Sequence, residues 1–315
     1  MQVRKVRDVI IYNIGWLIIV GMLIGGRAFI PGFFVIRNLI NILFHSSILG
    51  MLVLAESVCL ISGQLDLSIE STLAFSVGIA SLWMTQGSMG VSGLWGIAIT
   101  VLVGLLIGAA NGVCVVKLRI HPFLMTLAVL IILRGLMLYL IPRTIFGLPK
   151  DYVFIGSARI LTLPLPIFLF LGMYGIFHGI LRYTPFGRAL YATGGSTKAA
   201  FAVGISTDKV LVASFVISGF LASLAGLIMA GRMQAVTNGM GEGMVFLALA
   251  GAIIGGVSLK GGVGTAFQAF CGVIILGMID NMLVLSRFSP YLVYAVKGFL
   301  VLVAIVIDSF RQRIS

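Results

Sequence analysis

Long apolar runs constrain this chain more than any other feature. About ten stretches carry few charged residues over a length close to 20, which is the length that a helix needs to cross a bilayer's hydrocarbon core. The runs cover roughly residues 9–26, 35–61, 67–86, 93–116, 122–141, 163–181, 210–230, 244–257, 264–285 and 290–308. The sequence therefore predicts an all-α polytopic membrane bundle of about ten transmembrane helices, forming one domain over residues 1–315.

The low charge content excludes a soluble globular protein. Only 10% of the 315 residues are charged, whereas soluble domains carry about 25%. The net charge of +12 does not indicate a nucleic-acid partner, because the basic residues gather at the ends of apolar runs and no patch mixes them with aromatic residues. The positions of the basic residues instead indicate the topology of the chain in the membrane.

The positions of the basic residues predict which side of the membrane each loop occupies. With the N-terminus inside, 12 of the 21 Lys and Arg residues fall on the cytoplasmic side, 6 fall outside and 3 lie within spans. The twelve are Arg4, Lys5, Arg7, Lys117, Arg119, Arg182, Arg188, Lys198, Lys209, Lys260, Arg311 and Arg313. Cytoplasmic loops carry the excess of Lys and Arg, so both termini are predicted to be cytoplasmic. The first run is predicted to be a retained helix, because no Ala-x-Ala-like cleavage site follows it.

Two runs depart from a simple helix, and two others carry small residues at four-residue intervals. The second run is expected to break in its first half, where five polar residues occur, and the eighth is short and bounded by glycine. The five are Arg37, Asn38, Asn41, His45 and Ser46. The small residues are Gly104, Gly108 and Gly112 in one run, and Ser218, Ala222, Gly226 and Ala230 in another. Such faces allow close backbone approach and predict helix–helix contacts.

The longest polar interval, residues 182–209, is the first candidate site. It holds four basic residues against Asp208 alone, which places it on the cytoplasmic side. A short helix is expected in its second half, capped by Ser196 or Thr197 and stopped at Gly204. A small-faced helix in an otherwise membrane-buried chain suggests a docking surface for another protein. The alternative is that a long loop between spans simply needs local structure.

The second candidate site is the polar cluster at residues 62–72, which lies at membrane depth. Seven ionisable residues fall within spans: Arg37, Glu56, Asp66, Glu70, Arg134, Asp280 and Lys297. Each costs about 2.5–3.5 kcal/mol at the bilayer centre, so most are expected to face the bundle interior, a water-filled path or the interface. Asp66 or Ser68 is expected to cap the third span, to line a path, or to do both. The residues proposed for the translocation path are Gln64, Asp66, Ser68, Asn111, Phe123 and Thr126.

Motifs for chemistry within this chain are missing. No HExxH, nucleophile elbow, paired Cys/His pattern or GxxxxGK[ST] phosphate loop occurs. Cys59, Cys114 and Cys271 lie singly within apolar runs and are expected to be small buried residues. His121 precedes a proline and is expected to be a turn residue. The sequence thus predicts no catalytic residue, no metal site and no cofactor of its own.

Several ordered blocks resemble one known family over nearly the whole chain. Residues 62–68 (SGQLDLS), 122–127 (PFLMTL), 184–188 (TPFGR), 191–195 (YATGG) and 255–262 (GGVSLKGG) stand at family spacing. They resemble the membrane permeases of the ribose/xylose/autoinducer group of bacterial ATP-binding-cassette importers. Three positions depart from the family pattern: Gln64 replaces its second glycine, Glu70 stands where glycine is usual, and Val245 stands where an acidic residue is usual.

The resemblance implies a permease subunit in the bacterial inner membrane. It implies an ATPase subunit that binds the ATP, a periplasmic solute-binding protein, a second permease subunit and a sugar or similar small polar solute. It also implies that the long cytoplasmic loop docks on the ATPase. The residues of that loop are Thr184, Phe186, Gly187, Arg188, Gly194, Gly195, Ala199, Ala200 and Gly204.

Other transport functions remain open from the sequence. The alternatives are a permease for nucleosides or branched-chain amino acids, and a proton-driven secondary transporter. The second of these would use Asp66, Glu56 or Asp280 as its proton carrier.

Overall fold

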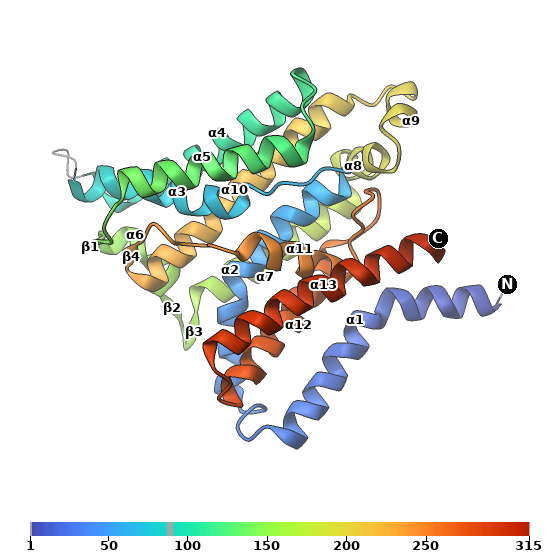
Figure 1. The fold of residues 1–315 in the computed structure, drawn as a ribbon, viewed down its shortest axis with the longest axis horizontal. Coiled ribbons are helices and arrows are strands. Elements are labelled where there is room, and N and C mark those ends of the chain that lie inside the picture. The colour runs from blue at the N-terminus through green and yellow to red at the C-terminus, as the bar shows by residue number, and fades with distance from the viewer. Residues whose placement is uncertain (1, 87–90, 315) are drawn as a thin grey trace.

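The computed structural model describes residues 2–86 and 91–314, and these form a helical bundle (Figure 1). The helices are α1 (Gln2–Phe29), α2 (Ile36–Ile61), α3 (Ile69–Ser81), the π-helical turn η1 (Leu82–Gln86), α4 (Gly93–Lys117), α5 (Pro122–Leu140), α6 (Lys150–Ser157), α7 (Leu165–Tyr183), α8 (Pro185–Gly195), α9 (Thr197–Ala202), α10 (Thr207–Met233), α11 (Met244–Gly255), α12 (Ala266–Leu285) and α13 (Pro290–Ile314). Two short antiparallel strand pairs join β1 (Ile145–Phe146) to β4 (Ala235–Val236) and β2 (Arg159–Ile160) to β3 (Leu163–Pro164).

Six of the described helices are long and apolar enough to cross a membrane: α2, α4, α5, α7, α10 and α12. Four shorter apolar helical stretches accompany them, at Gly15–Phe29, Ile69–Thr85, Met244–Gly255 and Pro290–Val306. The prediction of an all-α membrane bundle is confirmed.

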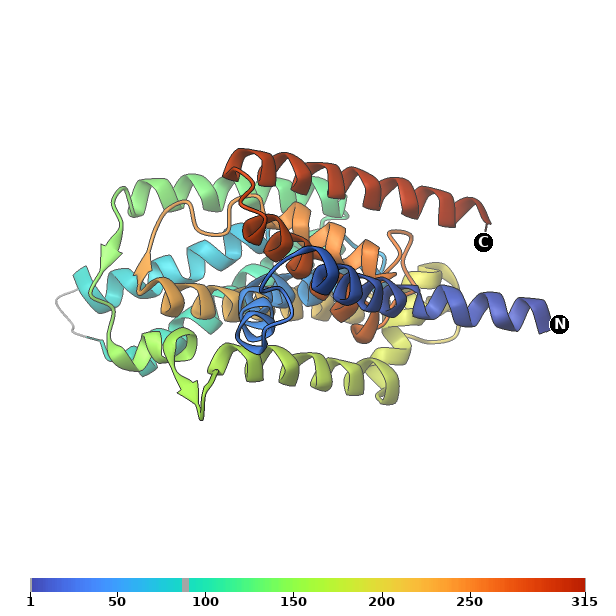
Figure 2. The same cartoon turned by 90° about the horizontal axis from the view of Figure 1, so that it is seen from below.

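The bundle is built around α2 and α10. The apolar window of α2 is 78% buried and that of α10 is 67% buried, against 17% for α5. A helix that is apolar all round yet buried must be surrounded by other helices, and Figure 2 shows both helices inside the bundle with α5, α7 and α13 outside them. The exposed apolar side chains of the outer helices, such as Ile131 and Ile132 of α5, are suited to contact with lipid.

Glycines on α4 hold α4 and α10 at close range. A Cβ atom on Gly104 would lie 2.5 Å from the carbonyl oxygen of Gly219, and one on Gly112 would lie 2.8 Å from the Cα of Val212. A Cβ on Gly108 would collide with the Phe215 carbonyl. Close backbone approach is a common basis of helix association in lipid, so the predicted role of these small residues is confirmed.

The expected break in the second span is wrong, because α2 is one helix from Ile36 to Ile61. Two of its polar residues, Asn38 and His45, find partners on neighbouring elements and do not need a broken backbone. Asn38 and Asn281 exchange side-chain amide hydrogen bonds of 2.9 Å in both directions. His45 Nδ1 accepts a 2.7 Å hydrogen bond from the Arg232 guanidinium.

The short helices α3 and α11 each follow a non-helical segment. Residues 62–68 precede the 13-residue α3, and residues 234–243 lead into the 12-residue α11. Gly63 (φ +78°), Gly241 (φ +72°) and Gly243 (φ +77°) occupy left-handed backbone conformations there, which glycine adopts without steric cost. These two segments carry the polar groups of the candidate site.

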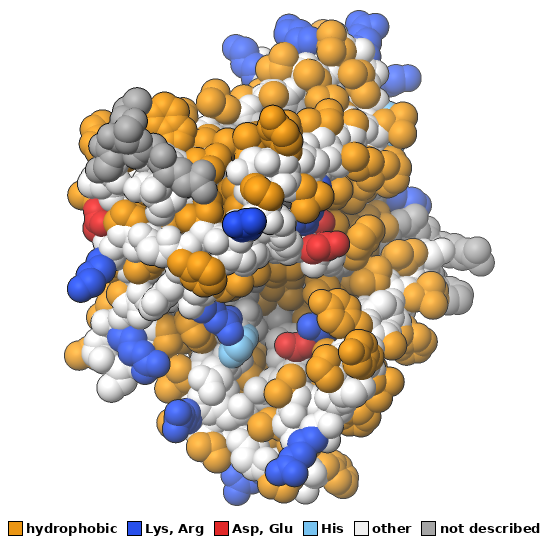
Figure 3. Space-filling model, turned by 60° about the vertical axis from the view of Figure 1, so that its left-hand side comes forward, with side chains coloured by type: hydrophobic (Ala, Val, Ile, Leu, Met, Phe, Trp, Pro, Cys, Tyr) orange, Lys and Arg blue, Asp and Glu red, His pale blue; other side chains and the backbone are white. Residues whose placement is uncertain are grey.

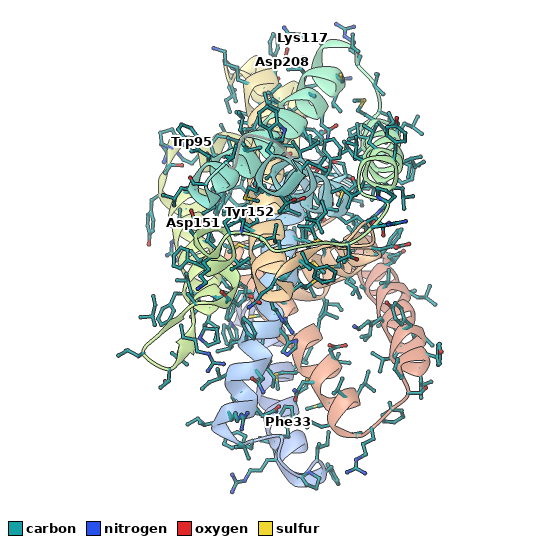
Figure 4. The ribbon with its side chains drawn as sticks, turned by 90° about the vertical axis from the view of Figure 1, so that its left-hand side faces the viewer. Phe33, Trp95, Lys117, Asp151, Tyr152 and Asp208 are labelled. Atoms are coloured by element: carbon teal, nitrogen blue, oxygen red, sulfur yellow. The ribbon has the colours of Figure 1, made fainter. Side chains whose placement is uncertain are left out.

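The two ends of the bundle differ. Both termini lie at the same end as α8 and α9, while α6 and the strand pairs lie at the opposite end (Figures 1 and 2). Figure 4, which looks at the molecule from the left-hand side of Figure 1, shows Lys117 and Asp208 near the top of the view and Phe33, in the turn between α1 and α2, at the bottom. The side chains of Arg4, Lys5, Arg7, Arg311 and Arg313 lie outside the described part of the structure.

Candidate translocation and coupling sites

Asp66 is the centre of a buried polar cluster within the bundle. Its Oδ1 accepts hydrogen bonds from the Ser68 backbone N–H at 3.0 Å and from the Ser68 hydroxyl at 2.6 Å. Its Oδ2 accepts one from the Ser218 hydroxyl of α10 at 2.7 Å. Charge-assisted bonds of this kind are about twice as strong as neutral ones. Asp66 therefore fixes the start of α3 against α10.

Asn111 and Thr126 extend this cluster to two further helices. The Asn111 side-chain amide on α4 donates to Ser68 Oγ at 2.8 Å. Thr126 Oγ1 on α5 accepts from the Leu67 backbone N–H at 3.1 Å. The structure thus brings together four of the six predicted path residues, from α4, α5 and the segment before α3.

The other two predicted path residues do not join this cluster. Phe123 is 42% exposed on the outside of α5. Gln64 is half-buried, and its backbone N–H donates to the Cys59 carbonyl at 2.9 Å.

Glu56 is a fully buried carboxyl group beside this cluster. It lies on α2 next to Asp66, and neither of its oxygens has a hydrogen-bond partner among the described residues. The Asn111 Oδ1 atom is also buried and unpartnered there. Burying polar groups without partners is costly, so these oxygens give the cluster unused hydrogen-bonding capacity.

Glu70 and Arg134 join α3, α5 and the segment before α11. Glu70 Oε1 lies 3.1 Å from Arg134 Nη2, and Glu70 Oε2 accepts from the Val245 backbone N–H at 3.1 Å. Arg134 Nη1 donates to the carbonyls of Asn238 at 3.0 Å and Met240 at 3.1 Å. Irregular backbone at membrane depth is thereby satisfied by side chains.

The segment 184–204 forms two short helices, where one had been expected. Thr184 caps α8, accepting from the Gly187 N–H at 3.2 Å. Ser196 caps α9, accepting from the Ala199 N–H at 3.3 Å, and Gly204 follows α9 with φ +85°. The predicted helix, its cap and its glycine stop are confirmed. Helix α8 was missed because its 11 residues are too few to show a clear repeat of apolar positions.

Gly194 and Gly195 place the end of α8 against two other turns. The Gly262 N–H donates to the Ile61 carbonyl at 2.9 Å. A Cβ on Gly194 would collide with that same carbonyl and would lie 2.7 Å from the Gly262 nitrogen. The ends of α2, α8 and the turn before α12 therefore meet at one point.

The segment of α8 and α9 exposes both apolar and basic side chains. Phe201 is 72% exposed and Val203 is 77% exposed, with Arg188 and Lys198 exposed on the same segment. Ala199 is exposed too, whereas Ala200 is only 3% exposed and packs within this chain. Of the other predicted loop residues, Phe186 is half-buried and Gly187 is buried.

Sequence reasoning missed the partners of several ionisable residues. Lys297 Nζ lies 2.7 Å from Asp280 Oδ1, which links α13 to α12. Opposite charges in two consecutive spans were the available signal for this pair. Ser218 was noticed only as a small residue, although its hydroxyl also bonds Asp66. Among the described residues, no three His, Cys, Asp or Glu side chains gather as a metal site.

Comparison with known proteins identifies the family. Residues 38–305 match the family described as branched-chain amino acid transport system / permease component. The ribose import permease protein RbsC of Haemophilus influenzae is 33% identical over 285 residues, covering 89% of this chain and 87% of the relative. The L-arabinose transport system permease protein AraH of Escherichia coli is 32% identical over 302 residues, covering 95% and 91%.

A third relative extends the comparison to another genus. The ribose import permease protein RbsC of Bacillus subtilis is 32% identical over 281 residues, covering 88% of this chain and 86% of the relative. No solved structure matches this chain. The family match and the relatives confirm the resemblance that the sequence blocks indicated, and the chain belongs to the permease-component family of binding-protein-dependent importers.

Proposed function

We propose that this chain is the membrane permease subunit of a bacterial ATP-binding-cassette importer for a monosaccharide or a similar small polar solute. The observation that carries the proposal is similarity over nearly the full length to relatives named for ribose and L-arabinose transport. The chain crosses the inner membrane about ten times, with both termini and α8–α9 in the cytoplasm. The shared end of the termini and α8–α9 supports this orientation.

The energy comes from a separate ATPase subunit that docks on α8 and α9. The exposed Phe201 and Val203 give this surface apolar anchors, and Arg188 and Lys198 give it positive charge. Removal of water from such apolar anchors favours association of the two proteins, while the charged groups fix their relative orientation. A periplasmic binding protein delivers the solute, and a second permease subunit completes the pathway.

Passage of the solute depends on rearrangement around the cluster of Asp66, Ser68, Asn111 and Thr126. These residues tie the end of α2 to α3, α4, α5 and α10, and Gly194 links the same region to α8. A movement of α8 on the ATPase is therefore transmitted to the start of α3 through directly packed backbone. This chain performs no chemistry on the solute or on ATP.

The test is uptake by the complete importer in proteoliposomes. The chain is purified with its ATPase subunit and its solute-binding protein, and uptake of labelled D-ribose, L-arabinose and L-leucine is measured with ATP inside or outside the vesicles. We expect ATP-dependent uptake of a sugar that needs the binding protein. Uptake of L-leucine alone would support the branched-chain amino acid class in the family's description. Uptake driven by a proton gradient without ATP would overturn the proposal.

A further inference from the structure

A hollow separate from the Asp66 cluster opens between α2, α11, α12 and α13. It has a volume of about 550 Å³, within the range of roughly 300–1,000 Å³ that is usual for small-molecule sites. Figure 3 shows the recess, where a histidine and both acidic and basic side chains gather among apolar ones. Its polar lining residues are His45, Ser46, Glu242, Asp280, Asn281, Tyr294 and Lys297.

One polar atom of this hollow has no partner of its own. Ser46 is 3% exposed, and its Oγ is without a hydrogen bond among the described residues. It faces Gly277 of α12, where a Cβ atom would collide with the Ser46 hydroxyl. Native structures pair nearly all buried polar groups with protein or water. The Ser46 hydroxyl is therefore unused hydrogen-bonding capacity in the wall of the hollow, although it lies against Gly277 and is not itself open to the recess.

The charges in and immediately around the hollow balance one another. Asp280 and Lys297 form an ion pair across it, and each side chain is partly open to the recess, at 40% and 32% exposed. Glu242 adds a second negative charge to the lining, and Arg232, which contacts His45 from outside the lining, adds a second positive charge nearby. An ion that entered would lose its hydration without gaining a net opposite charge. The balance therefore favours an uncharged polar ligand.

The remaining lining suits the C–H faces of such a ligand. Leu49, Phe246, Leu247 and Val301 line the hollow, and Tyr294 adds an aromatic ring. Ligand sites commonly combine an apolar surface with a few polar groups that fix orientation. Carboxylates can accept hydrogen bonds from the hydroxyls of a polyol, and an amide and a hydroxyl can both donate to and accept from them.

We infer that this hollow holds the solute during its passage and that the ligand is an uncharged polyhydroxylated molecule of monosaccharide size. The inference rests on the proposed function, because it takes the chain to be a solute permease. It adds a site within the single subunit that is distinct from the Asp66 cluster and from the α8–α9 surface.

Two glycines give a matched test of this site. A Cβ on Gly298 of α13 meets nothing within 4 Å, and Gly298 lines the hollow. Gly175 of α7 is also exposed within a helix and meets nothing, but it does not line the hollow. We expect Gly298→Leu to lower ATP-dependent uptake of D-ribose or L-arabinose at least tenfold in the reconstituted importer. Gly175→Leu should change uptake less than twofold, and basal ATPase activity should persist in both variants.

A second variant keeps the test decisive if Gly298→Leu assembles poorly. In an importer without its native cysteines, Gly298→Cys is modified after assembly with a small or a bulky methanethiosulfonate. Inhibition that grows with reagent size, and that excess sugar slows, is expected. Equal uptake after the bulky reagent, or after Gly298→Leu, would overturn the inference while wild-type uptake still upheld the proposed function. No sugar uptake by the wild type would instead overturn the proposed function itself.

Discussion

Glu70 and Arg134 form an ion pair with 3.1 Å between Oε1 and Nη2, and this pair holds a non-helical segment in place inside the bundle. The Arg134 guanidinium also bonds two carbonyls of residues 234–243, and Glu70 caps the first turn of α11 through Val245. Val245 stands where the resembled family usually has an acidic residue. Here the carboxylate comes from α3 instead.

Breaking this pair should destabilise the protein. Arg134→Ala leaves the Glu70 carboxylate, only 7% exposed, without its counter-charge and frees two carbonyls. Removing one partner of a buried pair costs about 3–5 kcal/mol, so we expect a clearly lower thermal midpoint in detergent. The double variant Glu70→Gln/Arg134→Met should recover part of this loss. A midpoint for Arg134→Ala equal to that of the wild type would contradict the role of the pair.

Gly194 should tolerate no side chain. Gly194→Ala forces its methyl group against the Ile61 carbonyl and the Gly262 nitrogen, both of which are backbone atoms. We expect uptake to fall more than tenfold, with weaker co-purification of the ATPase subunit. The matched control is Gly195→Ala, because a Cβ on Gly195 meets nothing within 4 Å. Equal uptake by both variants would show that this contact does not matter.

Substitutions of Asp66 should distinguish a capping role from a role in transport. Asn keeps an acceptor for the Ser68 N–H and is as good a cap as Asp, so Asp66→Asn should assemble but transport more slowly with its ATPase still stimulated. Ala removes every bond of this side chain, costing about 0.5–2 kcal/mol as a cap, and should reduce assembly. Uptake and ATPase rates in proteoliposomes measure both effects. If Asp66→Asn takes up solute at the wild-type rate, Asp66 acts only as a helix cap and has no role in transport.

The exposed apolar residue of α9 should be needed for ATPase docking. Phe201→Glu places a charge at the centre of the proposed contact, where Phe201 is 72% exposed. We expect most of the ATPase subunit to be lost on co-purification. Phe146→Glu is the control, because Phe146 is 71% exposed at the opposite end of the bundle. Equal recovery of ATPase with both variants would exclude docking through Phe201.

The two ends of the bundle should label from opposite sides of the membrane. In a background without native cysteines, Thr197→Cys should react with an impermeant maleimide only in inside-out vesicles, and Lys150→Cys only in intact spheroplasts. Both positions are exposed, so access does not limit the reaction. Labelling of position 197 from the periplasm would reverse the proposed orientation.

The all-α helical character of the chain and the packing face of α4 followed from the sequence because they depend on local patterns. Apolar run length placed the helices, and four-residue spacing of Gly104, Gly108 and Gly112 marked the α4–α10 contact. The cap at Ser196 and the stop at Gly204 are equally local. These features need no knowledge of distant residues.

Pairings between distant spans did not follow from the sequence. Asn38 suggested a broken helix, but its partner Asn281 lies 243 residues away and removes the need for one. The ionisable residues were expected to face inward. Which of them form an ion pair, such as Glu70 with Arg134, depends on how α3 and α5 cross, and the sequence does not show this. The hollow beside Ser46 arises only when four helices meet, so no single stretch signalled it.

The shortness of α3 and α11 has a consequence for biogenesis. At a rise of about 1.5 Å per residue, the 12 residues of α11 extend about 18 Å, and the apolar helical stretch Ile69–Thr85, which combines α3 with most of η1, extends about 25 Å. Both are shorter than the hydrocarbon thickness of about 30 Å. Released alone into lipid, either helix would carry bare backbone groups of its flanking segment into hydrocarbon. Each must therefore leave the insertion machinery together with the helix that satisfies those groups, which is α5 in both cases, through Thr126 for the segment before α3 and through Arg134 for the segment before α11. Insertion of this protein is thus a cooperative event that waits for parts of the chain synthesised much later or much earlier.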